Sequence, residues 1–156
     1  MYLVIAILIL ALVAWLAART STRDVPAAEI EVIDGDTVAI DGRRMRLKGV
    51  DAPEWRQDGG REAAGYLRRA LRGAGRVTVR SRGRDRYARP LVILIAEDGT
   101  DLNFRLVLHG YAVAYSRYSR KYAGAQRLAM NGRRGVWADP DAMWPEQYRH
   151  GGRRRS

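Results

Sequence analysis

Hydrophobic and polar positions divide the chain into a leader and a patterned body. Residues 1–18 are continuously apolar, and a helix of that length just crosses a bilayer core. Residues 30–50 alternate apolar and polar positions on both sides of Asp41-Gly42, a dipeptide typical of tight hairpin turns. Similar runs at 76–82, 89–100 and 111–115 predict further strands, because successive side chains of a strand face opposite sides of a sheet.

Three stretches of the body have the period of a helix instead. Within residues 59–73 the apolar positions recur at helical spacing and share one face. Residues 102–110 predict a helix that ends at Gly110, and residues 122–135 predict another that ends in a glycine-containing turn. The order of elements favours a mainly β, α+β fold: a small five-stranded barrel with about three helices, preceded by the apolar helix. The predicted divisions are a leader at 1–18, a polar linker at 19–28, a globular domain at 29–148 and a basic tail at 149–156.

The leader predicts a signal anchor or an uncleaved transmembrane helix. A cleaved signal peptide is the alternative, although no Lys or Arg precedes the apolar run. Arg19 and Arg23 follow it, and the positive-inside rule would leave the domain cytoplasmic, but two charges weigh little. We expect a membrane-anchored or secreted protein whose domain lies outside the cytoplasm.

Charge and composition narrow the classes of function. The net charge is +11, and all but two of the 28 basic residues are arginines, whose planar fork matches phosphate. A polyanionic partner such as nucleic acid is therefore indicated, with an anionic membrane surface as second choice. The chain has no cysteine and only two histidines, which excludes disulfides and thiolate zinc sites and disfavours a site with several histidine ligands.

Against this basic background, residues 31–54 hold six of the 17 carboxylates. Asp34 and Asp36 are two positions apart and project to one side of an extended segment, where they repel unless a cation lies between them. The hairpin would bring Asp36 near Asp51, and oxygen ligands of this kind suit Ca²⁺ or Mg²⁺. Either acidic motif alone would be an ordinary turn, but both occur in order with Arg46 between them.

A second candidate cluster lies at residues 82–91. Arg86 and Arg89 bracket Tyr87, so the arginines could bind phosphate while the tyrosine stacks on a base. The alternative is a solvated basic hairpin loop.

These motifs resemble the staphylococcal nuclease (thermonuclease) family over residues 29–140. The matching pieces, in order, are Asp34-Gly-Asp-Thr37, Arg46-Leu-Lys-Gly-Val-Asp51-Ala-Pro-Glu54, Asp85-Arg-Tyr-Ala-Arg89, Asn103 with Leu-Val-Leu-His-Gly-Tyr-Ala, and Gly135-Val-Trp-Ala-Asp139. The family has an OB-fold barrel with helices and cleaves DNA and RNA using Ca²⁺.

The resemblance implies roles by position. Asp36, Asp51 and the main-chain carbonyl of Ala52 would bind Ca²⁺, and Asp34 would support the metal site without binding the ion. Glu54 would activate or orient the attacking water. Arg46 and Arg89 would bind the scissile phosphate. The terminal phosphate and its nucleotide would be bound by Arg86, Tyr87 and Tyr115.

The chain departs from the family pattern at a few positions. Ala52 stands where the family often has threonine, and Ala88 where it usually has glycine. The segment after Ala112 is shorter, which makes Tyr118 an alternative to Tyr115. Tryptophans 55, 137 and 144 are assigned to core or surface packing rather than to base stacking.

Three hypotheses follow. The first is a Ca²⁺-dependent nuclease acting on DNA and RNA, with single strands preferred, 3′-phosphate products and a monomeric state. The second is a membrane-tethered OB-fold module that binds nucleic acid without cleaving it. The third is a membrane-anchored adaptor whose basic surface faces lipid head groups, which leaves the acidic constellation unexplained.

Overall fold

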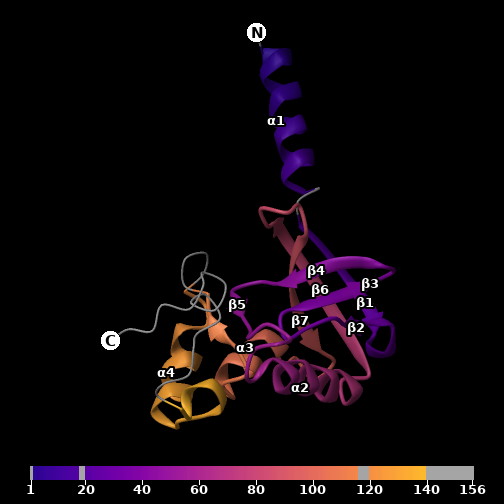
Figure 1. The fold of residues 1–156 in the computed structure, drawn as a ribbon. Coiled ribbons are helices and arrows are strands. Elements are labelled where there is room, and N and C mark those ends of the chain that lie inside the picture. The colour runs from indigo at the N-terminus through magenta and orange to yellow at the C-terminus, as the bar shows by residue number, and fades with distance from the viewer. Residues whose placement is uncertain (1, 18–19, 116–119, 140–156) are drawn as a thin grey trace.

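A computed structural model describes residues 2–17, 20–115 and 120–139, which form a mixed α+β fold (Figure 1). The helices that the sequence predicts at 59–73, 102–110 and 122–135 are confirmed, each a little shorter than predicted. The helices are α1 (Tyr2–Ala17), α2 (Gly60–Arg72), α3 (Leu102–Leu108) and α4 (Ala123–Asn131), with 3₁₀ turns η1 (Ala27–Glu29) and η2 (Gly135–Trp137). The strands are β1 (Thr20–Pro26), β2 (Glu31–Val32), β3 (Thr37–Ile40), β4 (Arg43–Leu47), β5 (Val50–Asp51), β6 (Arg76–Arg84), β7 (Pro90–Ala96) and β8 (Val113–Ala114).

The strands form one large sheet and one small ladder. The six-stranded sheet has the order β1-β6-β7-β4-β3-β2, and β5 pairs separately with β8. Within the large sheet β4 and β7 run parallel, and the other neighbouring strands are antiparallel. Because β1 and β2 are the two edges of this order, closure into a five-stranded OB barrel stays a prediction.

Strand β1 corrects the predicted linker. Over Thr20–Pro26 the chain pairs along β6, from Thr20 opposite Arg82 to Pro26 opposite Arg76, so the folded part begins before Glu29. The strand escapes sequence analysis because, of residues 21–26, only Val25 is buried, while residues 21–24 are exposed and polar. An edge strand of this kind has the composition of a loop.

Helix α2 packs its predicted apolar face into the core and fixes the position of the Asp34–Asp36 segment. Ala63, Ala64, Leu67 and Leu71 are buried. A Cβ added to Gly35 would lie 2.6 Å from the Cβ of Ala52 and 2.7 Å from that of Ala63. Glycine is therefore required between the two aspartates, because their backbone presses directly against α2.

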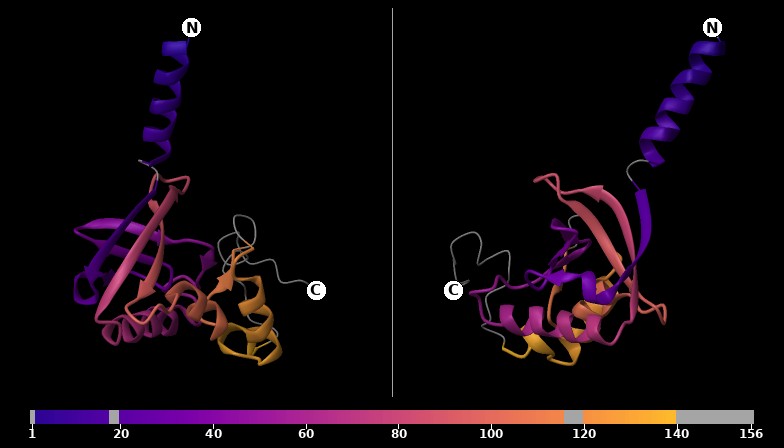
Figure 2. Two further views of the ribbon diagram at one scale, coloured as in Figure 1. Left: turned by 180° about the vertical axis from the view of Figure 1, so that it is seen from behind. Right: turned by 90° about the vertical axis from the view of Figure 1, so that its right-hand side faces the viewer.

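Helix α1 extends away from the sheet and the other helices (Figure 2). The prediction of a membrane-spanning helix over residues 1–18 is not supported. Among the residues that the structure describes, no helix is both long enough and apolar enough to cross a bilayer. The predicted basic tail at 149–156 lies outside the described residues.

Candidate active site

The β3–β4 hairpin brings the predicted acids together, as its turn at Asp41-Gly42 implies. Asp41 and Gly42 both have positive φ angles, 51° and 71°, as a tight hairpin turn requires. Asp36 precedes β3 and Asp51 ends β5. Arg46 of β4 lies between them: its Nη1 is 2.8 Å from Oδ1 of Asp36, and its Nη2 is 2.8 Å from Oδ1 of Asp51.

The backbone around Asp36 holds its carboxylate in place. Oδ2 of Asp36 accepts a hydrogen bond from the Ala52 amide at 3.0 Å, and Oδ1 also accepts one from the Thr37 hydroxyl at 3.1 Å. The amide of Asp36 donates to Oδ1 of Asp34 at 3.0 Å, so Asp34 supports the site from its edge. Asp36 is only 4% exposed and Asp51 only 1%, so protein atoms rather than solvent surround both carboxylates.

Burial raises the pKa of Asp36 to about 7, against the opposing charge of Arg46. The neighbouring carboxylates of Asp34 and Asp51 add to the rise. A buried carboxyl whose pKa is raised, as that of Asp36 is, gains from a nearby cation, which here is the Arg46 guanidinium.

Glu54 lies in a tight corner between β5 and α2. Its amide donates to Oε1 of Gln57 at 3.2 Å, and the Gln57 amide donates to the carbonyl of Glu54 at 2.8 Å. A Cβ added to Gly60 would clash with the carbonyl oxygen of Glu54 at 2.0 Å. The backbone is thus fixed while the Glu54 side chain stays partly exposed. The sequence does not predict this role of Gln57, because a lone glutamine in a loop carries no motif.

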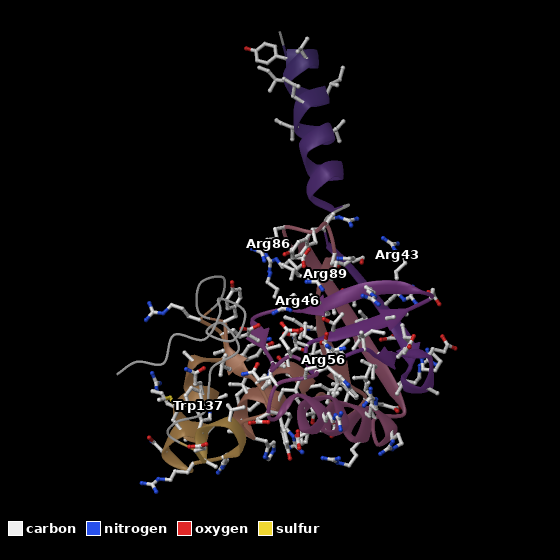
Figure 3. The ribbon with its side chains drawn as sticks, viewed as in Figure 1. Arg43, Arg46, Arg56, Arg86, Arg89 and Trp137 are labelled. Carbon is white, nitrogen blue, oxygen red and sulfur yellow. The ribbon has the colours of Figure 1, made fainter. Side chains whose placement is uncertain are left out.

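The β6–β7 hairpin presents the second cluster. Asp85 binds Arg89 twice: its Oδ2 accepts from Nε at 2.7 Å and its Oδ1 accepts from the Arg89 amide at 2.9 Å. Burial alone would raise the pKa of Asp85, but the hydrogen bonds from Arg89 and Tyr87 outweigh it and hold the pKa below its usual value. The Cζ atoms of Arg86 and Arg89 lie 4.7 and 5.5 Å from the Tyr87 ring centroid. In Figure 3, Arg86, Arg89 and Arg46 lie on the same side of the molecule.

Ala88 adopts a φ of +61°, which explains why a glycine suits this position of the turn. We expect Ala88→Gly to stabilise the protein by roughly 0.5–1 kcal/mol, because relief of left-handed strain exceeds the added entropy of the unfolded chain. Urea unfolding measures the difference. Ala138→Gly is the matched control: Ala138 is exposed with φ −71°, so glycine should destabilise there. A destabilising Ala88→Gly would show that the turn is not strained.

Two further residues connect the site to the core. Asn103 is fully buried; its Nδ2 donates to the carbonyls of Lys48 and Val92, each at 3.1 Å, and thereby ties the end of β4 to β7. The amide of Tyr115 donates to the carbonyl of Gly49 at 3.0 Å, which continues the β5–β8 pairing past Val50, at the end of the ladder away from Asp51. Tyr118, the alternative to Tyr115, lies outside the described residues.

The donor atoms around Asp36 are oxygens, the kind of ligand that suits a hard cation, although few side chains contribute them. In the described part of the chain no group of three or more His, Cys, Asp or Glu side chains could hold a metal ion. Asp36 and Asp51 supply two carboxylates, and the Ala52 carbonyl is adjacent, which is the all-oxygen donor set that Ca²⁺ prefers. One guanidinium already lies between the carboxylates, so the position between them accommodates positive charge.

Comparison with known proteins identifies relatives of this chain. The family described as "Staphylococcal nuclease homologue" matches residues 44–139. An "Uncharacterized endonuclease" of Escherichia coli O157:H7 is 36% identical over 133 residues, which cover 81% of this chain and 86% of the relative. A "Micrococcal nuclease" of Shigella flexneri is 33% identical over 137 residues, 77% of this chain and 78% of the relative. The "Succinoglycan biosynthesis protein ExoI" of Rhizobium meliloti (strain 1021) is 37% identical over 143 residues, 81% of this chain and 75% of the relative.

Proposed function

Because the chain belongs to the staphylococcal nuclease family and is a nuclease, we propose that it is a Ca²⁺-dependent phosphodiesterase. It hydrolyses DNA and RNA with little sequence or sugar preference and leaves 3′-phosphate ends. The observation that carries the proposal is the pair of buried carboxylates, Asp36 and Asp51, joined by one arginine, with a partly exposed Glu54 three residues after Asp51. A structural ion pair alone would not require that glutamate.

Each residue has a chemical task in this proposal. Asp36, Asp51 and the Ala52 carbonyl would hold Ca²⁺, which supplies a Lewis acid for the phosphoryl oxygen. Glu54 orients the attacking water and accepts its proton at a carboxylate oxygen. Arg46 and Arg89 neutralise the charge that grows on the non-bridging oxygens during attack.

The substrate class follows from the contacts available. Guanidinium groups bind phosphate oxygens that every nucleotide shares, and the exposed ring of Tyr87 can stack on any base. Arg86 and Tyr115 would complete this subsite. None of these contacts reads a base edge or a 2′-hydroxyl, and stacking needs an unpaired base. The preferred substrates would therefore be single strands of either DNA or RNA.

Analysis of the product ends tests the reaction type. End-labelled single-stranded DNA and RNA of equal sequence are digested with Ca²⁺, and the fragments are treated with a 3′-phosphatase. The proposal predicts that fragments from both substrates shift in mobility after phosphatase treatment. Fragments with 3′-hydroxyl ends would contradict it.

The pKa of Asp36 predicts how Ca²⁺ binding depends on pH. Since this pKa is about 7 in the metal-free protein, Asp36 holds a proton below that pH, and Ca²⁺ must displace it. Ca²⁺ affinity should rise by up to about tenfold per pH unit until neutrality and level off above it. Calorimetric titration in buffers of different ionisation enthalpy measures both the affinity and the released proton. A flat affinity from acid to neutral pH would contradict the expectation.

We also propose that the protein is a monomer that acts outside the cytoplasm, anchored or secreted by residues 1–18. The continuous apolar sequence of this segment supports export. Fractionation of cells that express the full chain, with N-terminal sequencing of the recovered protein, tests the location and any cleavage. Recovery of the whole chain from the cytoplasm would contradict it.

A further inference from the structure

Two exposed aromatic rings in this basic domain carry the same arrangement of arginines. Trp55 is 43% exposed, although the sequence assigns it to packing, and Tyr87 is 63% exposed. The Cζ atoms of Arg61 and Arg68 lie 5.9 and 5.7 Å from the Trp55 ring centroid. The Cζ atoms of Arg86 and Arg89 lie over the Tyr87 ring at comparable distances, so each ring is an aromatic platform with two guanidinium groups over it.

The two platforms come from different elements next to the catalytic residues. Trp55 directly follows Glu54 in the β5–α2 loop, whereas Tyr87 lies two residues before Arg89 in the β6–β7 hairpin. In the view of Figure 3, Arg46 lies between Arg86 above it and Arg56, the neighbour of Trp55, below it. Each platform therefore adjoins one of the catalytic residues along the chain, Glu54 in the first case and Arg89 in the second.

Local structure holds the Trp55 platform in position. Arg61 and Arg68 are two turns apart on α2, so they lie along one face of the helix. Nη2 of Arg68 donates to the carbonyl of Val32 at 3.0 Å, which ties the platform to strand β2 beside the Asp34 segment. The short, tight corner at Gly60 fixes the loop that carries Trp55.

We propose that Trp55, with Arg61 and Arg68, forms a second nucleotide subsite, separate from that of Tyr87. This inference rests on the proposed nuclease function. Trp55 stacks on an unpaired base, and the arginines bind the adjoining phosphates, because a ring flanked by guanidinium groups offers both contacts to one nucleotide. The subsite favours single strands long enough to reach both platforms, since bases within a duplex present no free face.

Binding measurements separate this subsite from the rest of the site. The full chain carrying Glu54→Gln, in Ca²⁺, is titrated with fluorescent oligothymidylates from dinucleotide to octanucleotide. Trp55→Ala should weaken octanucleotide binding roughly tenfold, the usual size of one lost base stack, and change dinucleotide binding less than about twofold. An octanucleotide without bases should bind both proteins equally.

Salt dependence separates the ring from the arginines. Arg61→Gln should lower the slope of log affinity against log salt by about one, whereas Trp55→Ala should leave the slope unchanged. Trp55→Phe, which keeps a ring, should retain most of the octanucleotide affinity. Phe104→Ala is the matched control, because Phe104 is also exposed, at 36%, but lies on α3.

The outcomes are decisive. Equal loss for every oligonucleotide length, or no loss for the octanucleotide, would overturn the subsite while leaving the nuclease proposal standing. If the parent protein bound no oligonucleotide at all, both proposals would fail. Thermal melting checks that each variant folds. If Trp55→Ala does not fold, Trp55→Leu replaces it, because leucine keeps apolar bulk without a ring. Trp55→Leu must then show the same length-dependent loss of affinity.

Discussion

Glu54→Gln is expected to lower the rate of phosphodiester cleavage by about 10²–10⁴-fold. The substitution keeps the shape of the side chain but removes the oxygen that accepts the proton of the attacking water. The hydrogen bonds of the Glu54 backbone, to the Gln57 side chain and from the Gln57 amide, do not involve the changed group, so the corner should keep its structure. Single-turnover cleavage of single-stranded DNA at saturating Ca²⁺ measures the chemical step directly.

Glu62→Gln provides the matched control for this experiment. Glu62 is an exposed acid in the first turn of α2, so the same change there should leave cleavage within about twofold, as expected for surface substitutions. Affinity for uncleaved single-stranded DNA should be nearly unchanged in both variants. A rate for Glu54→Gln within tenfold of the parent would remove Glu54 from its assigned role.

Arg46→Met is expected to affect stability and rate together. In a chelator, the variant leaves the buried carboxylates of Asp36 and Asp51 without their shared partner, a loss of about 3–5 kcal/mol. Added Ca²⁺ should restore much of that stability, because the ion would occupy the place between the same carboxylates. Cleavage should stay about 10²–10³-fold slower even then, because the positive charge facing the transition state is missing.

Urea unfolding with and without Ca²⁺, paired with single-turnover cleavage, measures both effects. Arg44→Met is the control: Arg44 lies two residues earlier on the same face of β4, but it is exposed and pairs with Ala39 of β3 rather than with the residue that follows Asp36. That variant should stay near the parent in stability and rate. If Arg46→Met were as stable as the parent in chelator, or if Ca²⁺ did not stabilise it, the carboxylate pair would not be the cation site.

The parts of the fold that the sequence predicts are those with strong local signals. The Asp41-Gly42 turn predicts the β3–β4 hairpin, and the hairpin in turn predicts the proximity of Asp36 to Asp51 that Arg46 confirms. The apolar face of α2 is equally predictable, because its buried residues recur at helical spacing.

The parts that escape prediction depend on long-range contacts. β1 is a strand because β6 lies beside it, and its own polar residues resemble a linker. The contact of the Trp55 ring with two arginines depends on where α2 packs, which no local pattern encodes. Likewise, Asp85 is recognisable as a motif residue, but its two hydrogen bonds to Arg89 depend on the left-handed turn at Ala88.

The central claim is that the acids gathered in residues 31–54 hold a cation for cleavage of nucleic acid. The most direct test is digestion of end-labelled single-stranded DNA by the full chain, in Ca²⁺ and in a Ca²⁺ chelator, beside the Asp36→Asn, Asp51→Asn double variant. We predict rapid cleavage by the parent in Ca²⁺, none in chelator, and none by the variant in either. Cleavage that persists in chelator or in the double variant would contradict the claim.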